Sequence, residues 1–358
     1  LAAYYFDKAG YTVTICEASG RTGGLISTKK ISEHGIAEGA AHSLLATREV
    51  RELCAELGVN LLEINAGSRS RYIFRGMKML RFPLTFKEAL HCLRRVFLMP
   101  ASLSNRQATL EEWGIRHLGV PATKFLLTPF VRGIYGVMPS ELYVGVAFPK
   151  LNIPPGFSLG LWFIPKIILR IFSRQKAKMV TPRVGMQELV DALSARLRQN
   201  IGARFQVGRR VEILPDSTNI ILTVPASEAS KVLRDHDTRL SSALEKIEYA
   251  SLTSVTVFAD KNEFAWIPSG VGVLMAPDSQ ASCYGILFNS SSFQNRVQRE
   301  NEQVSLTMMY PAKVTEDQIK ETVYKDLDNV FGFRKDTAIT IVSHRYDRAI
   351  PKYDLKLL

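Results

Sequence analysis

The first 24 residues place a strand, a carboxylate, a guanidinium and two glycines in a fixed order. Residues 1–9 favour a helix that Gly10 ends, and residues 11–16 favour a strand because they are rich in β-branched side chains. Glu17 follows that strand directly. Helix, glycine, strand and acid are typical of the second half of a βαβ dinucleotide-binding unit. The order therefore predicts a Rossmann-like α/β domain.

The residue types around Glu17 suit the parts of a dinucleotide. A carboxylate at a strand end can accept hydrogen bonds from both ribose hydroxyls, and the planar guanidinium of Arg21 can neutralise a diphosphate. Gly23 and Gly24 remove Cβ atoms where the backbone approaches a ligand or adopts a positive φ. FAD fits better than NAD, because the Arg-Gly-Gly extension adds contacts beyond the ribose. A surface strand end followed by a glycine turn is the alternative.

The position of Glu17 leads to a further expectation. In βαβ units this acid lies about 20 residues beyond a glycine-rich turn that holds the phosphates. Counting back from Glu17 passes Leu1. The first strand and its glycine-rich turn are therefore expected upstream of this sequence, which would make it an N-terminally truncated fragment.

Composition narrows the class of partner. The chain of 358 residues has 46 Lys and Arg against 34 Asp and Glu, a net charge of +12, which favours anionic ligands or lipids. Zinc-finger and aromatic RNA-binding patterns are missing, so no nucleic acid partner is expected. The 4 cysteines lack C-x-x-C spacing and the 6 histidines lack H-E-x-x-H, so no metal is predicted.

Membrane contact is predicted to be peripheral. No run of about 18 uncharged apolar residues is present. The nearest candidate, residues 159–172, is interrupted by Pro165, Lys166 and Arg170. This segment is too short and too charged to span a bilayer, but it could lie in the interface or pack on the protein's own core.

The remaining patterns divide between helices and strands. Helices are predicted at 47–58, 88–99, 186–199 and 316–331, and a strand, a turn at Pro225 and a helix over 219–233. Successive strands of a mostly antiparallel sheet are predicted at 252–260, 270–276, 283–289 and 303–310, with a later one starting at 337. The alternation predicts α/β and α+β parts that interleave along the chain.

Four later stretches, together with EASGRTGGLIST, carry a family resemblance. They are TPFVRGIYGVMPSELYVGVAFPKL (128–151), GVGVLMAP…GILFNSSSFQNR (270–296), VGMQELVDAL (184–193) and RAIPKY (348–353). The chain resembles the oxygen-dependent protoporphyrinogen oxidases, within the superfamily of FAD-dependent amine oxidases. The resemblance covers nearly the whole chain. The family's C-terminal flavin segment, which follows AIPKY, is missing, so truncation at both ends and weak or no FAD binding are expected.

The resemblance implies site residues by position. It implies no catalytic side chain, because the flavin supplies the chemistry. It implies an Arg71 contact with a substrate propionate, and Leu274 and Met308 as apolar walls of the substrate pocket. The implied cofactor-binding residues are Glu17, Ala18, Arg21, Gly23, Gly24, Leu25, Gly39, Ala40, Ala41, His42 and Val211.

The implied activity is the FAD-dependent oxidation of protoporphyrinogen IX to protoporphyrin IX with O2 as acceptor, a step of haem biosynthesis. Oxidation of coproporphyrinogen III by the same fold is one alternative, and a truncated relative without flavin or activity is another. An amine or polyene oxidase is disfavoured by the PFVRGIYG and FNSSSFQNR stretches. The resemblance also implies a peripheral position on the cytoplasmic side of a membrane, and a homodimer is a further expectation.

Four parts are predicted along the chain. They are a first FAD-binding part at 1–70, a helical membrane and substrate region at 71–180, a second FAD-binding part at 181–235 and a substrate-domain sheet at 236–358. The predicted fold class is α/β plus α+β: a Rossmann-like FAD-binding domain, interleaved with a mixed or antiparallel-sheet substrate domain and a helical membrane-binding region.

Overall fold

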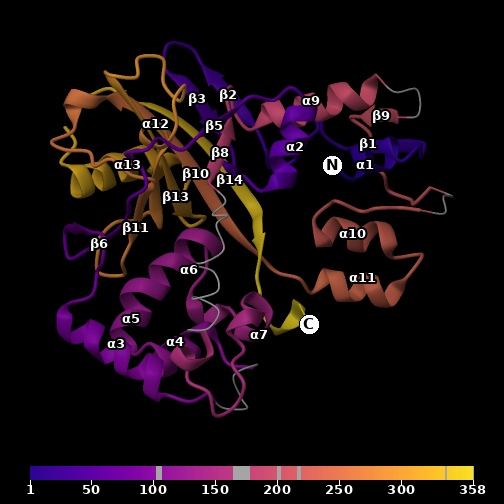
Figure 1. Ribbon diagram of the computed structural model, residues 1–358. Coiled ribbons are helices and arrows are strands. Elements are labelled where there is room, and N and C mark those ends of the chain that lie inside the picture. The colour runs from indigo at the N-terminus through magenta and orange to yellow at the C-terminus, as the bar shows by residue number, and fades with distance from the viewer. Residues whose placement is uncertain (102–106, 164–177, 200–202, 216–218, 335–336, 358) are drawn as a thin grey trace. The chain divides into compact units, whose positions relative to one another are not determined.

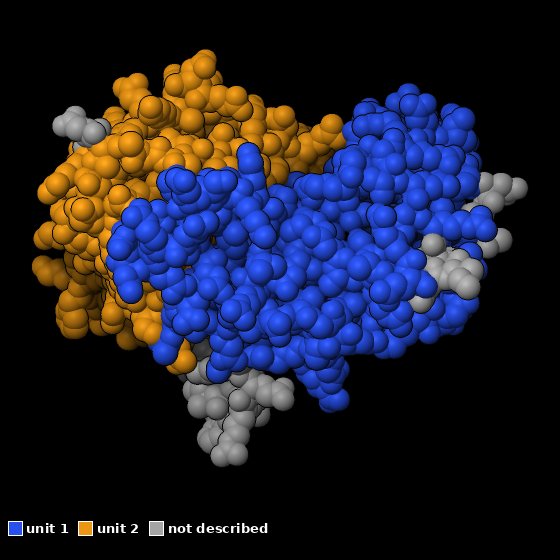
Figure 2. All heavy atoms as spheres, turned by 90° about the horizontal axis from the view of Figure 1, so that it is seen from above, with its two compact units in different colours: residues 1–66, 177–245, 292–303 blue, residues 67–176, 246–291, 304–358 orange. Residues whose placement is uncertain are grey.

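The chain forms two compact units, and each is assembled from three separate segments (Figure 2). The first unit comprises residues 1–66, 177–245 and 292–303, and the second comprises 67–176, 246–291 and 304–358. This agrees with the interleaving that the sequence predicted. The computed structural model describes residues 1–101, 107–163, 178–199, 203–215, 219–334 and 337–357 (Figure 1).

A parallel strand pair and its helices form one part of the first unit. Strand β1 (Val13–Glu17) pairs with β9 (Ala203–Val207), so that Glu17 lies opposite Val207 at the carboxyl ends of both strands. Helix α1 (Ala2–Lys8) precedes β1, and α9 (Gln187–Arg198) precedes β9 (Figure 1). These elements confirm the predicted helix, strand and acid. Tyr4, Leu53 and Leu197 form the buried cluster of this part.

Short strands and a capped helix complete the central part of this unit. Thr47 accepts a hydrogen bond from the Val50 N–H and so begins helix α2. Gly58 adopts a φ of +70° just past the helix end, a conformation that favours glycine. The elements are α2 (Arg48–Glu56), the hairpin of β2 (Thr28–Ile31) and β3 (Gly35–Glu38), and a sheet in the order β4 (Leu44–Leu45), β8 (Met179–Pro182), β5 (Leu61–Glu63).

One strand prediction in this unit is wrong. Residues 219–224 form no strand, whereas the helix predicted after Pro225 is present as α10 (Ala226–Leu233), followed by α11 (Thr238–Glu245). A strand exists only where a neighbour accepts and donates its backbone hydrogen bonds, and within the described ranges β1 and β9 pair only with each other. The apolar side chains of this segment are consequently exposed: Ile220, Ile221, Leu222 and Val224.

A seven-stranded mixed sheet organises the second unit. Its order is β14-β10-β13-β12-β11-β6-β7, in which β6 and β11 run parallel while β10–β14, β11–β12, β12–β13 and β6–β7 are antiparallel. The predicted strands are all present, as β10 (Tyr249–Asp260), β11 (Gly272–Met275), β12 (Gly285–Phe288), β13 (Gln303–Pro311) and β14 (Thr340–Pro351). Strands β6 (Arg71–Arg75) and β7 (Lys78–Leu80), which were not predicted, complete the sheet.

The two faces of this sheet have different neighbours. One face packs against helix α13 (Glu316–Phe331) in the main apolar core, which contains Val273, Ile286, Met308 and Phe331. The other face carries the alternate residues, because side chains of a strand point to opposite sides in turn. The strand register aligns Ile73, Leu274, Gly285 and Met309 in one row on that second face.

Helices between β7 and β8 form the rest of the second unit (Figure 1). Leu110, Trp113, Val131 and Leu142 bury their side chains in a second apolar cluster. The predicted segment 159–172 begins as helix, and its residues beyond 163 lie outside the described part. These helices are α3 (Phe86–Leu98), α4 (Leu110–His117), α5 (Val120–Ala122), the π-helical turn Thr123–Leu127, α6 (Thr128–Tyr135) and α7 (Val144–Ala147), with 3₁₀ turns at Pro139–Glu141 and Pro149–Leu151. Later in the chain come a short α12 (Asn289–Ser292) and 3₁₀ turns at Lys261–Glu263 and Leu355–Leu357.

Candidate cofactor and substrate sites

The carboxyl ends of β1 and β9 bring two predicted contact segments together. The Arg209 N–H donates to the Glu17 carbonyl at 3.0 Å, and the Gly208 N–H donates to the Ser19 carbonyl at 2.9 Å. The Glu17 carboxylate accepts the Ser19 N–H at 2.7 Å, which orients it toward this loop. Val211 follows two residues beyond Arg209. The structure thus places Glu17 and the Val211 loop at one edge of the strand pair.

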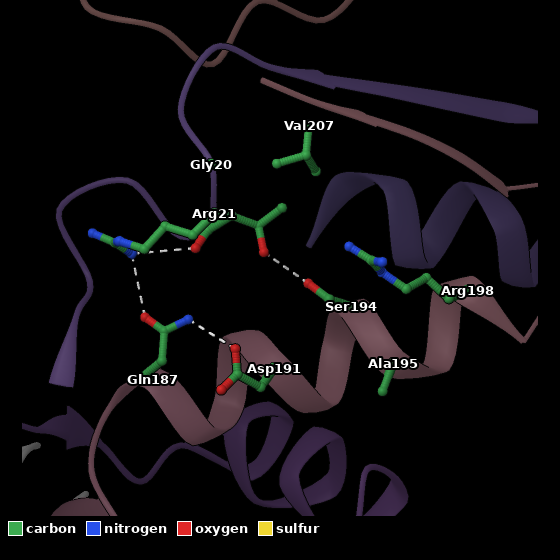
Figure 3. A pocket seen from close by; sticks show the side chains of 9 residues that line it. Gly20, Arg21, Gln187, Asp191, Ser194, Ala195, Arg198 and Val207 are labelled. Atoms are coloured by element: carbon green, nitrogen blue, oxygen red, sulfur yellow. Dashed lines mark hydrogen bonds between the residues drawn. The ribbon is translucent and has the colours of Figure 1, made fainter. Parts of the chain in front are cut away.

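Arg21 organises the glycine turn that follows. Its guanidinium donates to the carbonyl oxygens of Gly24 at 2.7 Å, Ile26 at 2.8 Å and Thr22 at 3.2 Å. It also donates to Gln187 Oε1 at 3.3 Å (Figure 3). These bonds turn the backbone carbonyls inward and fix the loop. Whether this guanidinium also meets a diphosphate stays a prediction.

The glycines of the turn are required by backbone geometry. Gly23 and Gly24 have φ values of +112° and +56°, in the region that L side chains rarely adopt. A Cβ on Gly23 would lie 3.1 Å from both the Ile26 carbonyl and Val190 Cγ1, so a side chain there would be crowded as well as strained. The turn therefore presents bare backbone, as a phosphate-contacting loop needs.

The predicted flavin-contacting segment 39–42 is hydrogen-bonded to the same loop. The Gly39 N–H donates to the Ser27 carbonyl at 2.7 Å, and the Ala40 N–H donates to the Leu25 carbonyl at 3.3 Å. The two predicted segments are thus neighbours. Ala18, Leu25 and Ala40 are exposed, and Ala41 is half-buried. One continuous surface of the first unit therefore runs from Glu17 to His42.

His42 has a buried nitrogen that nothing in the described part of the chain satisfies. Its Nε2 is closed to solvent and has no hydrogen-bond partner there. Burial, reinforced by the nearby Arg296 charge, lowers the pKa of His42 to about 4. The imidazole is therefore neutral at physiological pH. An orphaned buried polar atom costs free energy unless another group meets it.

A buried ion pair supports segment 39–42, and the sequence did not reveal it. Glu38 and Arg296 are 4% and 3% exposed, and Arg296 Nη1 donates to Glu38 Oε1 at 3.0 Å. Glu38 also accepts the Thr28 hydroxyl at 2.6 Å and the Met186 N–H at 3.0 Å. Burial raises the pKa of Glu38, while Thr28 and Arg296 oppose that rise. The FQNR stretch contains Arg296, but no spacing rule pairs it with Glu38.

A cavity of about 530 Å³ lies beside the Arg21 loop (Figure 3). The Thr22 and Ser194 hydroxyls, 2.9 Å apart, join the Arg21 loop to helix α9. Within α9, Gln187 Nε2 donates to Asp191 Oδ1 at 2.9 Å. Its lining combines cationic, neutral and acidic groups: Gly20, Arg21, Thr22, Gln187, Asp191, Ser194, Ala195, Arg198 and Val207.

The predicted substrate residues all lie in the second unit. Arg71 begins β6 opposite Gly272, and its exposed position is at the strand end. Leu274 is on the sheet face that α13 does not cover, whereas Met308 is fully buried in the α13 core on the opposite face. The structure thus does not bring Leu274 and Met308 together. Met309, which the sequence did not single out, shares the Leu274 face.

Helix α6 lies directly on Leu274. A Cβ built on Gly133 would be 2.3 Å from Leu274 Cδ2, so only glycine admits this side chain at its observed place. The helix belongs to the PFVRGIYG stretch, whose sequence therefore has a packing reason at this position. Among the residues that the structure describes, no three His, Cys, Asp or Glu side chains gather closely enough to hold a metal ion.

Comparisons with known proteins identify the family. The sequence matches the flavin-containing amine oxidoreductases over residues 1–356, and the chain belongs to this family. It is therefore an FAD-dependent oxidoreductase, which confirms the predicted superfamily and cofactor.

Relatives within the family are porphyrinogen oxidases at low identity. The chain is 23% identical to protoporphyrinogen oxidase 2 of Arabidopsis thaliana over 99% of this chain and 82% of that protein. It is 20% identical to coproporphyrinogen III oxidase of Bacillus subtilis, over 98% of this chain and 84% of that protein. A similar fold is found in the crystal structure of a protein from Exiguobacterium described as a putative protoporphyrinogen oxidase, with a TM-score of 0.73 and 17% sequence identity. The match covers 99% of this chain and 85% of that protein. The similar structure supports the mixed α/β fold predicted from the sequence.

Two features of the first unit fit FAD. The Arg21 loop offers backbone without Cβ atoms at the edge that carries the Glu17 carboxylate, and His42 Nε2 is a buried polar atom without a partner in the described residues. Glu17 suits ribose hydroxyls, the Gly23–Gly24 backbone suits phosphates, and segment 39–42 suits the ring system. When bound, FAD supplies the electron acceptor for the oxidation.

Proposed function

We propose that the chain oxidises a porphyrinogen to a porphyrin, and that protoporphyrinogen IX is its substrate with O2 as final acceptor. The observation that carries the proposal is the apolar sheet face of Ile73, Leu274 and Met309, in which strand β6 begins at Arg71. A flat apolar macrocycle with carboxylate tails requires apolar walls and a cation at the border. The porphyrinogen oxidases among the relatives support the same substrate class.

The chain's own residues would bind and orient the macrocycle. Leu274 offers an apolar wall, and Arg71 would pair with a propionate through its guanidinium. The conversion removes six electrons and six protons in three steps, so that three O2 become three H2O2 for each porphyrin formed. No side chain needs to act as nucleophile in this reaction.

The direct test mixes the purified, FAD-supplemented chain with protoporphyrinogen IX in air. We expect porphyrin fluorescence to appear above the spontaneous rate, with three H2O2 per porphyrin. Leu274→Glu should abolish the enzymatic rate, because a carboxylate would repel the macrocycle and its propionates. Leu240→Glu changes an exposed leucine of α11 in the first unit and is the matched control. A flavin-loaded chain that produces no porphyrin above background would contradict the proposal and favour a non-catalytic relative.

Coproporphyrinogen III is the second candidate substrate. The observation in its favour is the Bacillus subtilis coproporphyrinogen III oxidase, which is similar over 98% of this chain. That substrate carries two more propionates than protoporphyrinogen IX, so it would require further cations around the apolar face. The ratio of kcat/KM for the two porphyrinogens decides between them, and a higher value for coproporphyrinogen III would reassign the substrate.

We also propose that helix α3 holds the chain against an anionic membrane surface, on the cytoplasmic side. None of its residues is buried, and Phe86, Leu90, Leu93 and Phe97 recur at helical spacing with exposed side chains. Phe86 is 84% exposed. Lys87 and Arg94 lie on the same helix and are exposed, which suits anionic lipid. No helix within the described ranges is long and apolar enough to cross a bilayer.

Vesicle sedimentation tests this surface. The double variant Phe86→Ser and Leu93→Ser should sediment less with vesicles of phosphatidylcholine and phosphatidylserine than the wild type does. Each apolar side chain that enters the membrane interface contributes to binding, and the variant lacks two of them. Ile213→Ser and Leu240→Ser remove exposed apolar groups of the first unit and are the control pair. Equal binding of both double variants would contradict the assignment to α3. The homodimer stays a prediction, which sedimentation velocity would check.

A further inference from the structure

Arg132 is a half-buried cation that lies over an aromatic ring. It lies in the last turn of α6, and its guanidinium carbon is 4.6 Å from the centre of the Tyr284 ring. The next residue, Gly133, is the one that contacts Leu274. Tyr284 directly precedes Gly285, the strand partner of Leu274, so the guanidinium lies at the border of the apolar sheet face that carries Leu274.

The charge of Arg132 has no counter-ion in the described part of the chain. Its side chain makes no hydrogen bond and no ion pair there, and the groups that stabilise its charge are Tyr284 and Cys283. Both have pKa values raised by burial and are neutral at physiological pH. Other shielded arginines differ: Arg75 pairs with Glu88, and Arg296 with Glu38.

Hydrogen bonds fix the backbone that carries the Tyr284 ring. Asp326, which is 0% exposed, accepts the N–H groups of Ser282 and Cys283, both at 3.0 Å. The Tyr284 N–H donates to the Met309 carbonyl at 2.7 Å. A stacked arginine on a fixed ring keeps its N–H edges free for a planar acceptor and loses little entropy when it binds one. Carboxylates match that fork with two parallel hydrogen bonds.

We propose that Arg132 binds a carboxylate of the substrate while the apolar body of that substrate lies on the Leu274 face. The inference rests on the proposed porphyrinogen function and adds a second cation to Arg71. The two arginines come from different elements, α6 and β6. They would bind the carboxylate tails of the macrocycle, and substrates that lack such tails would therefore bind more weakly.

Binding of two stable porphyrins tests the assignment without turnover. Protoporphyrin IX carries two carboxylates, and its dimethyl ester carries none. Both would be titrated in detergent into the whole chain, with tryptophan fluorescence as the signal. The wild type should bind the diacid about tenfold more tightly than the diester, because a hydrogen-bonded charge pair is lost in the ester.

The variants assign this preference to one residue. Arg132→Met should weaken diacid binding by about tenfold and change diester binding by less than about twofold. Arg132→Lys keeps the charge without the fork and should retain part of the preference. Arg48→Met is the control, since Arg48 is an exposed residue of α2 in the first unit. Unchanged diester binding also reports that the variant is folded.

The outcomes separate the two levels of the proposal. If Arg132→Met keeps the wild-type preference for the diacid, the role of Arg132 is wrong while porphyrin binding stands. If the wild type binds both porphyrins equally, no carboxylate contact exists and the inference again fails. If the wild type binds neither porphyrin, both the inference and the proposed function are overturned. If Arg132→Met does not fold, the diacid and diester affinities of Arg132→Lys are compared with those of the wild type instead, and an unchanged preference in Arg132→Lys would contradict the role of the guanidinium fork.

Discussion

Single buried residues fix the cofactor segments more firmly than the sequence motifs suggest. Glu38 ends β3 and precedes Gly39, while Arg296 comes from a stretch more than 250 positions later in the chain. Their ion pair joins these two parts of the first unit, and Thr28 and Met186 complete the set of hydrogen bonds around the carboxylate. The position of segment 39–42 therefore depends on residues that need not touch a ligand.

Breaking this ion pair should be costly. Arg296→Met leaves the Glu38 carboxylate buried without its cation, and we expect the free energy of unfolding to fall by about 3–5 kcal/mol. Urea unfolding followed by circular dichroism measures it. Arg48→Met breaks an exposed pair with Glu52 and should cost at most about 1 kcal/mol. Equal losses for the two variants would show that the buried pair is not a main support.

Glu88 provides a pH-dependent test in the second unit. Hydrogen bonds from Arg75 lower the pKa of Glu88 to about 2, from an ordinary value of 4.5. A carboxyl whose folded pKa is lowered stabilises the protein above its unfolded pKa, and this contribution is lost as pH falls from 4.5 to about 2. Glu88→Gln should therefore lower Tm at neutral pH, and its difference from wild type should shrink across that window. A Tm difference that stays constant with pH would refute this.

At the scale of secondary-structure elements, strand register and helix packing determine which side chains lie beside Leu274. The strand register of β6, β11, β12 and β13 decides that Ile73, Leu274 and Met309 share a face, and α6 limits the space above Leu274. Because α6 packs this closely on Leu274, the sequence of the helix limits the shape of the proposed substrate pocket. The contact also places Arg132 at the border of that face.

Gly133→Ala tests this contact between elements. The added Cβ would lie 2.3 Å from Leu274 Cδ2, so the leucine side chain must move. Alanine favours the helix, so we expect little loss of Tm but a clear loss of porphyrin affinity. Leu274→Val in the same chain should restore part of that affinity by vacating the space. If Gly133→Ala binds protoporphyrin IX as the wild type does, Leu274 is not a wall of the pocket.

At the scale of the whole molecule, chain segments far apart in the sequence build each unit. The predicted cofactor surface uses loops near residues 17–27, 39–42 and 208–211, and all of them belong to the first unit. The sheet with Leu274 and the helices α3 and α6 belong to the second. The predicted four-part division along the chain stays a prediction.

Hydrogen exchange should separate the two units when FAD is added. Amides in residues 17–27, 39–42 and 207–211 should exchange more slowly at saturating FAD, because ligand binding suppresses local opening. Amides of α13, in the core of the second unit, should change little. Mass spectrometry of peptic fragments measures the exchange rates in the first-unit segments and in α13. Protection that appears in the second unit alone would move the flavin site away from Glu17.

The sequence determined the local elements and the chemistry of the opening stretch. Helix α1, strand β1 and Glu17 follow from β-branched content, a glycine and a carboxylate that act over a few residues. The strands around 252–310 were predictable for the same reason. The EASGRTGGLIST stretch predicted the flavoprotein superfamily, which the comparison confirms. The PFVRGIYG and FNSSSFQNR stretches narrowed the prediction to the porphyrinogen oxidases, which stays a proposal.

Only the tertiary structure decided which side chains meet. Residues 219–224 are as apolar as a strand, but a strand requires a neighbour, and that is not a local property. Leu274 and Met308 both read as pocket walls, yet strand register places them on opposite faces. Register and ion pairing act between residues far apart in the chain, so a linear pattern could identify residue types but not their partners.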